Sequence, residues 1–290
     1  MTIESLARSN MDLEELLDVE ATIHYTNAHD LRRTLRVFFD NAFHQDSLRD
    51  HTIVVTGFAA ENFIIDNDDD DDDDEPLILK KRKALYLEQS RILILTMPGA
   101  PHEKASRLFT MQLAFKLEEM NCIDEISPSG GAIQELNNVC KAPDESWGPV
   151  ATRYITFALE SGVSESTRAL QCDAKIWLEH PESHVTQVVT VKISRTRPEI
   201  IFSVWKTTPE DRETRAQHPR RASLDHEVRV TLAHGRPIAS GRLCLSFEQF
   251  FERRARLGTS ERDLVFSTRE LGRIARDVWV QMGFMPPPQH

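Results

Sequence analysis

The sequence predicts a mixed α/β fold, in which helices pack against a central β-sheet. Apolar residues recur at helical spacing in several segments along the chain. Short β-rich runs lie between these segments, and some of them are separated by hairpin-like turns. With 290 residues, of which 40% are hydrophobic and 28% charged, the chain is long enough and apolar enough to bury a real core.

Residues 1–65 are expected to form an N-terminal extension with one helix. The repeat of apolar residues predicts a helix over 30–43, with Asn27 or Asp30 as its N-cap. The residues that make this repeat are Leu31, Leu35, Phe38, Phe39 and Ala42. A short strand is expected over 52–55, and no chemistry is evident in this part of the chain.

An acidic and then basic low-complexity linker is expected over 66–83. Residues 66–75 carry nine acids and no base, so they offer nothing apolar to bury and predict a solvated loop. Without these nine acids the net charge rises from −11 to −2, so the overall acidity does not exclude a nucleic-acid partner. The basic tetrad at 80–83 resembles a nuclear-import signal. Charge balance against the acidic run is the simpler interpretation.

A core is expected over 84–206, where helical repeats alternate with β-rich runs. Pro98 and Pro101 break the chain before the first core helix, and Gly130-Gly131 predicts a turn. In order, the expected elements are a hairpin (84–88, 92–97), a helix (102–120), two short strands (122–126, 132–136), a strand (154–159), a helix (165–179) and a second hairpin (185–193, 199–205).

Residues 207–290 are expected to form a basic loop, edge strands and a C-terminal helix. Polar residues dominate 207–226, and short strands are expected over 228–232 and 243–247. The helix is expected over 267–282, where Ser267 and Glu270 match a capping box. Residues 191–262 carry 15 Lys and Arg against 9 Asp and Glu, a net charge of +6 that suits a polyanionic partner.

Several classes of protein are disfavoured. No apolar run approaches the roughly 18 residues of a membrane span, and residues 1–5 lack the start of a secretory signal. The four cysteines are far apart and form no CxxC pair, which argues against a disulfide framework or a zinc knuckle. We therefore expect an intracellular protein with free thiols, located in the nucleus or the cytoplasm.

Two carboxylates in the core have the properties of metal ligands. Hydrolysis of a phosphodiester requires a hard divalent cation, and such cations prefer oxygen ligands. Glu160 ends an otherwise apolar strand, where a charge is costly unless it is solvated, paired or bound to a metal. Asp144 follows Pro143 before a turn, and strand pairing would allow it to meet Glu160.

Four segments occur in an order that resembles a known family. Their sequences are LTMPGAPHE (95–103), KAPD (141–144), ESGVSES (160–166) and DAKIW (173–177). Together they resemble the PD-(D/E)XK nuclease superfamily, most closely its restriction-endonuclease-like branch and large sets of uncharacterised fungal proteins. The resemblance covers roughly residues 84–205. It implies a restriction-endonuclease-like mixed sheet, flanked by the helices over 102–120 and 165–179, and a hydrolase that cleaves DNA.

The resemblance also implies a metal site. By it, Asp144 and Glu160 would hold Mg²⁺ or Mn²⁺, and the backbone carbonyl of Ser161 would add a ligand. Glu103, on the first core helix, would supply a further carboxylate directly or through water. The catalytic residues would thus include both carboxylates, with DNA as the substrate.

The lysine departs from the family pattern. The superfamily places it two residues after the glutamate, where this chain has Gly162. Related branches carry the lysine on the following helix, and Lys175 fits that position. Lys175 is expected about 100° or more around the helix from the apolar stripe of Leu170, Ala174 and Trp177, so that it can point back toward the sheet edge. We therefore expect Lys175 to orient the attacking water.

Each of these residues also has a purely structural interpretation. Asp144 after a proline can simply stabilise a turn. Glu160 can form a structural ion pair with Lys175 or Arg168, and Lys175 can be an ordinary exposed lysine. Glu103 near a helix start is favoured by the helix dipole alone.

Two other functions therefore remain open. The glycine at position 162 favours a non-catalytic intracellular protein that keeps the fold as a binding scaffold. The acidic run at 66–75 suggests, less strongly, binding to histones or other basic proteins.

Overall fold

The computed structural model describes residues 17–62, 82–163, 166–208 and 220–287. The acidic run 66–75 and the first two residues of the basic tetrad lie outside these ranges. The chain divides into two compact units, which are described separately below. The first comprises Met1–Gly99 and Ile133–Ala142, and the second comprises Ala100–Ala132 and Pro143–His290.

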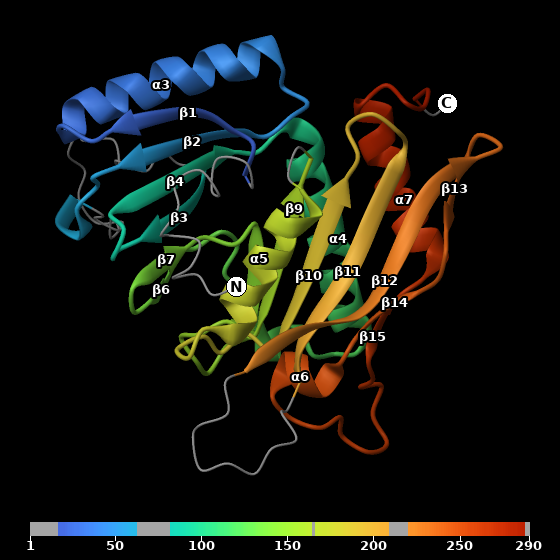
Figure 1. The fold of residues 1–290 in the computed structure, drawn as a ribbon. Coiled ribbons are helices and arrows are strands. Elements are labelled where there is room, and N and C mark those ends of the chain that lie inside the picture. Colours follow the sequence, from blue (N-terminus) through green and yellow to red (C-terminus); the bar gives the residue numbers. More distant parts are fainter. Residues whose placement is uncertain (1–16, 63–81, 164–165, 209–219, 288–290) are drawn as a thin grey trace. The chain divides into compact units, whose positions relative to one another are not determined.

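The first unit is a six-stranded sheet with one long helix packed on it (Figure 1). The predicted helix and the predicted hairpin, β3 with β4, are both present. The sheet order is β1-β2-β4-β3-β7-β6. The elements are β1 (Val19–His24), α3 (Ala28–Gln45), β2 (His51–Thr56), the 3-10 turn η1 (Ala60–Asn62), β3 (Lys83–Leu87), β4 (Ile92–Met97), β6 (Gln134–Leu136) and β7 (Val139–Lys141).

Helix α3 begins where the sequence predicts. The side chain of Asn27 accepts a hydrogen bond from the backbone N–H of Asp30 at 2.9 Å, which satisfies one of the free donors of the first turn. Leu35 and Phe39 are fully buried against the sheet. The guanidinium of Arg82 lies 3.9 Å from the centre of the Phe39 ring. The described half of the basic tetrad is therefore part of the packing of this unit.

The second unit is built on a seven-stranded sheet in the order β13-β12-β11-β10-β9-β8-β5. Strands β14 and β15 form a separate small ladder. The elements are α4 (Ala100–Glu119), η2 (Ile123–Glu125), β5 (Ile126–Pro128), β8 (Glu145–Pro149), β9 (Phe157–Gly162), α5 (Thr167–Glu179), β10 (Gln187–Ile193), β11 (Glu199–Thr208), β12 (Arg221–Ala233), β13 (Arg236–Ala239), β14 (Leu243–Leu245), α6 (Phe247–Phe251), β15 (Leu264–Phe266) and α7 (Thr268–Gln281).

The large sheet is mixed. Strands β9 and β10 pair in parallel, and α5 makes the crossover between them. All other neighbours in this sheet are antiparallel. Helix α5 lies on one face, and α4 and α7 lie on the other (Figure 1). The predicted class, a mixed α/β sheet flanked by helices and followed by a C-terminal helix, is confirmed.

The two faces of β9 have different roles. Phe157 and Leu159 point into the large apolar core beneath α4 and α7. In that core Phe109 of α4 stacks on Phe266, with ring centres 4.4 Å apart. Because side chains alternate along a strand, Glu160 and Gly162 face α5 instead. Both edge strands of the sheet, β5 and β13, are short, and each contains a proline.

Three sequence expectations differ from the structure. The strand expected over 154–159 is β9 at 157–162, since the small Ser161 and Gly162 still pair with β10. The strands flanking Gly130-Gly131 do not pair, because β5 and β6 belong to different sheets. Residues 221–226, expected in a loop, begin the long strand β12, whose polar side chains face solvent on an exposed part of the sheet.

Within the described residues, no helix combines the length and the apolar character that a membrane crossing requires.

We predict that Gly148→Ala destabilises the second unit. A methyl group at this position in β8 would overlap the backbone oxygen of Tyr154 and meet the Cα of Ile155 at 2.9 Å. Backbone atoms cannot rotate away, so we expect a loss of about 1–3 kcal/mol in the free energy of unfolding, measured with urea. Gly241→Ala is the matched control, because nothing lies within 4 Å of the added methyl group. Equal unfolding midpoints for the two variants would contradict this account.

Candidate functional site

Asp144 lies directly before β8 and is held against β9. Its backbone N–H donates to the carbonyl of Leu159 at 3.1 Å. Its Oδ2 accepts the backbone N–H of Ser161 at 2.5 Å. These two bonds reach the residues on either side of Glu160, so the structure brings Asp144 to the same stretch of β9 as the predicted second carboxylate.

The other oxygen of Asp144 contacts the start of α4. His102 Nε2 lies 3.0 Å from Asp144 Oδ1, and both side chains are buried. One turn further along α4, the Ser106 hydroxyl lies 2.9 Å from the hydroxyl of Ser161. Of the segment Pro-His-Glu that opens the first core helix, His102 is therefore in contact with Asp144. The contact of His102 with Asp144 was not predicted from the sequence.

Glu160 lies inside β9 rather than at its end, and its side chain is fully buried. Its Oε1 accepts the indole N–H of Trp177 on α5 at 2.5 Å. Trp177 belongs to the buried face of α5 that the sequence predicts. The tryptophan of the DxKxW segment is thus the hydrogen-bond donor to Glu160. The alternative pairing of Glu160 with Lys175 is not present, because Lys175 makes no hydrogen bond or ion pair with any described residue.

Glu103 occupies the first turn of α4 and is partly exposed. It forms an ion pair with Arg107, one turn along the helix, at 2.9 Å. A further carboxyl group lies nearby, since Glu145 is the first residue of β8. Burial raises the pKa of Glu145, and the charge of Asp144 raises it further, while Arg107 opposes the shift. Negative charge is therefore concentrated where α4 meets β8.

A different lysine lies opposite the position that lacks one. In the parallel ladder, Lys192 of β10 pairs with Gly162, and Thr190 pairs with Glu160. Residues two apart share a face, so the side chain of Lys192 begins on the same side of the sheet as Glu160, roughly 7 Å along the strands. Lys192 Nζ donates to the hydroxyl of Thr167, at the start of α5, at 2.6 Å. This pairing could not be predicted from the sequence, because strand register cannot be read from the spacing of residues.

The oxygen ligands suit a hard cation. Glu160 of β9 and Asp144, directly before the neighbouring strand β8, provide carboxylates. Mg²⁺ takes one or two carboxylates with water or substrate oxygens in the remaining positions. Both carboxylates are buried, which is the setting in which a bound cation best offsets their charge. To bind a metal, Asp144 would have to exchange its present contacts with His102 or with the N–H of Ser161.

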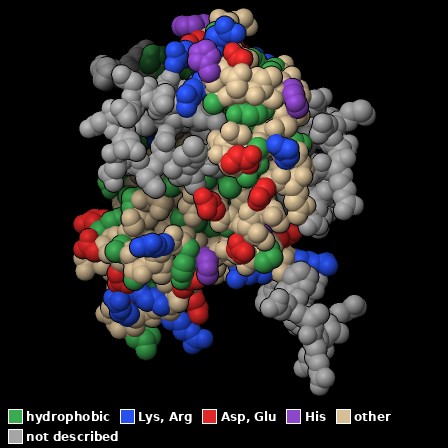
Figure 2. Space-filling view, turned by 90° about the vertical axis from the view of Figure 1, so that its left-hand side faces the viewer, with side chains coloured by type: hydrophobic (Ala, Val, Ile, Leu, Met, Phe, Trp, Pro, Cys, Tyr) green, Lys and Arg blue, Asp and Glu red, His purple; other side chains and the backbone are tan. Residues whose placement is uncertain are grey.

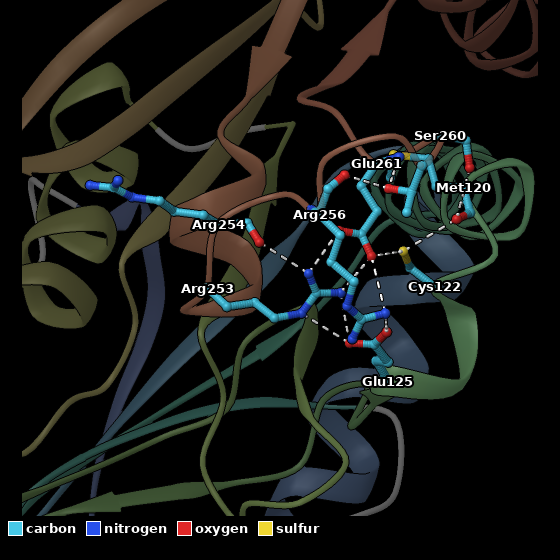
Figure 3. A network of polar contacts seen from close by, with 9 residues as sticks. Met120, Cys122, Glu125, Arg253, Arg254, Arg256, Ser260 and Glu261 are labelled. Atoms are coloured by element: carbon cyan, nitrogen blue, oxygen red, sulfur yellow. Dashed lines mark hydrogen bonds and ion pairs between the residues drawn. The ribbon is translucent and has the colours of Figure 1, made fainter.

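A second group of metal-type ligands lies elsewhere in the same unit. One ligand atom from each of Cys122, Glu125 and Glu261 lies within 4.8 Å of the others. Figure 3 shows that arginine side chains neutralise the two carboxylates of this group. Arg253 donates to Glu125 at 2.7 Å and to Glu261 at 2.8 Å, and Arg256 lies 2.9 Å from Glu125. The cluster ties the segment after α4 to the segment after α6.

The surface carries no uniform charge in the view of Figure 2. Acidic, basic and hydrophobic side chains of the described residues are interspersed on that face.

No protein-family model matches the chain, and no curated protein matches its sequence. Among solved structures, one similar chain, from Anabaena variabilis, is described as "a putative nuclease belonging to DUF820". The two chains share 10% sequence identity with a TM-score of 0.38, and the alignment covers 66% of this chain and 90% of that chain. A similarity this low carries no argument about mechanism. The expected link to fungal proteins finds no support in these comparisons.

We predict that Glu261→Gln lowers the melting temperature at neutral pH. The hydrogen bond from Arg253 holds the pKa of Glu261 down to about 2. A depressed pKa stabilises the folded state above the ordinary glutamate value, and that stabilisation is lost as pH falls toward 2. The difference between wild type and variant should therefore shrink in melts recorded from pH 7 down to pH 3.

Glu248→Gln serves as the control, because the ion pair of Glu248 with Arg254 is exposed and contributes little. A Glu261→Gln difference that stays constant across this pH range would show that the Arg253 contact is not the cause.

Proposed function

We propose that this protein is a metal-dependent nuclease that hydrolyses phosphodiester bonds in DNA, with Mg²⁺ or Mn²⁺ held by Asp144 and Glu160. The observation that carries the proposal is the pair of hydrogen bonds that join Asp144 to the residues flanking Glu160, one donated by Asp144 to Leu159 and one accepted from Ser161. The order of the four sequence segments, from the first core helix to the DxKxW helix, supports it. The carbonyl of Ser161 and the carboxylate of Glu103 are the further ligands that we assign, Glu103 directly or through water.

A bound divalent ion would lower the pKa of a water ligand and offset charge on the phosphoryl oxygens. The chain's own residues would hold this arrangement in place. The indole of Trp177 fixes the position of the Glu160 carboxylate from the α5 side. The buried His102 fixes Asp144 from the α4 side. The apolar core beneath β9 keeps the strand rigid.

The ammonium that orients the attacking water has two candidates. Lys175 is the residue that the family resemblance assigns, and it is half-buried on α5. Lys192 lies opposite Gly162 on the neighbouring strand and shares a face with Glu160. Its side chain is long enough to turn from Thr167 toward substrate. We therefore favour Lys192 for this role.

We predict that purified protein cleaves plasmid or single-stranded DNA with Mg²⁺ or Mn²⁺. Asp144→Asn and Glu160→Gln should each lower the cleavage rate by a factor of about 100 or more, because each removes a charged ligand while keeping side-chain volume. Melting curves should show that both variants fold. Glu248→Gln, which removes an exposed carboxylate, should cleave like wild type. Equal cleavage by wild type and both site variants would sink the proposal.

A pair of lysine variants distinguishes the two ammonium candidates. Lys192→Met should reduce cleavage about 100-fold, within the range expected for removing a group that assists proton transfer. Lys175→Met should leave the rate within a factor of three. The reverse result would return the role to Lys175. If both variants cleave like wild type, neither Lys192 of β10 nor Lys175 of α5 takes part in cleavage.

The alternative function, a non-catalytic binding scaffold, is favoured by one observation. Both oxygens of Asp144 already have protein partners, His102 and the N–H of Ser161. With both oxygens in use, the carboxylate has a sufficient structural role, which is to join α4 to β9. Calorimetric titration separates the two functions, because a scaffold should bind neither Mg²⁺ nor Mn²⁺ at millimolar concentration.

A further inference from the structure

A pocket of about 620 Å³ lies in the second unit, beside α7 and β13 and away from the carboxylates described above. Four arginines line it: Arg236 from β13 and Arg269, Arg273 and Arg276 from α7. The three on α7 are four and three residues apart, so they lie on one face of the helix. Like charges at this spacing destabilise a helix, and the arrangement therefore costs stability.

The arginines have no acidic partner of their own. All four are exposed, and no ion pair or side-chain hydrogen bond joins them to another described residue. The single acid lining the pocket is Glu270. Its carboxylate already accepts from Lys116 at 2.7 Å and from the backbone N–H of Ser267 in the capping box of α7. The charge of the arginines is therefore directed toward solvent and toward the pocket.

A buried amide supplies an independent observation. Gln112 of α4 lines the same pocket, and only 4% of its surface is exposed. Its Nε2 has no hydrogen-bond partner among the described residues. A buried donor without a partner is expensive, so an acceptor supplied from outside the protein would relieve that cost. The amide of Gln112 and the arginine guanidinium groups are all donors, so the ligand that suits them is an anion with several acceptor oxygens.

The spacing points to more than one phosphate group. Arg269 and Arg276 are seven residues apart, which is about 10 Å along the helix axis. A single phosphate is too small to meet guanidinium groups over this length. Arginine forks match phosphate oxygens in bidentate geometry, and arginine remains charged at any ordinary pH.

We propose that this pocket binds the sugar–phosphate backbone of a nucleic acid. The choice of a nucleic acid over a small polyphosphate rests on the proposed nuclease function, whereas the anion site rests on the pocket alone. The backbone would run along the arginine face of α7, and the amide of Gln112 would donate to a phosphate oxygen. Contacts of this kind position a strand without reading its sequence.

The test measures binding of the full-length protein to a fluorescent single-stranded DNA oligonucleotide by anisotropy, with EDTA present. Arg273→Gln combined with Arg276→Gln should weaken binding at least tenfold. The slope of log K against log salt concentration should fall in magnitude by about 1.4, the value for two lost contacts to single-stranded phosphates. The matched control is Arg33→Gln with Arg254→Gln, which removes equal charge from two exposed sites and should change affinity less than twofold.

Gln112→Met provides a second measurement. It should weaken oligonucleotide binding severalfold without lowering the melting temperature, because it removes a buried donor that has no protein partner. A lower melting temperature with unchanged binding would show that the amide serves the fold, and would remove this residue from the site.

Inorganic triphosphate, used as a competitor, separates the two sources of phosphate. Wild-type protein that binds triphosphate but not the oligonucleotide would overturn the nucleic-acid assignment. Equal oligonucleotide affinity in the pocket variant and its control would overturn the site itself. Because the assay involves no turnover, a protein that binds DNA through these arginines yet never cleaves it would support this site and contradict the proposed nuclease function.

Discussion

The carboxylate of Asp144 is the constraint on which the candidate site depends. One oxygen meets His102 on α4 and the other accepts the N–H of Ser161 on β9. A single, largely buried side chain thus joins the first core helix to β9. Bonds to a buried charge are stronger than those between neutral groups, and this makes the position of β9 relative to α4 well defined.

The two faces of β9, which Asp144 holds in place, have different surroundings. On the face toward α4, Phe157 and Leu159 join the apolar core, and Ser161 meets the hydroxyl of Ser106. The face toward α5 holds Glu160 beneath the indole of Trp177. The candidate carboxylate on one face of β9 is therefore backed by side-chain packing on the other face. Two basic features of this unit lie on different elements: Lys192 is on β10, and the arginine face is on α7.

The sequence predicts helices and strands well where apolar residues recur at a clear helical or strand spacing. The helix with Asn27 as its cap, the hairpins and the capping box of α7 all appear as expected. It fails where weak strand formers continue a strand, as Ser161 and Gly162 do, since their pairing is decided by β10 and not by their own preference. Asp144 and Glu160 could be chosen from motif order. The contacts of His102 and Lys192 could not, because helix docking and strand register are long-range properties.

The two outer strands of the large sheet have a consequence for association. An edge strand offers unpaired N–H and C=O groups to any extended chain that approaches it. Here β5 ends in Pro128 and β13 contains Pro237, and a proline has no N–H to donate. Each edge is also only three or four residues long. Where these two strands form its border, the sheet is thereby protected against growth by strand addition, although β13 covers only residues 230–233 of the longer strand β12.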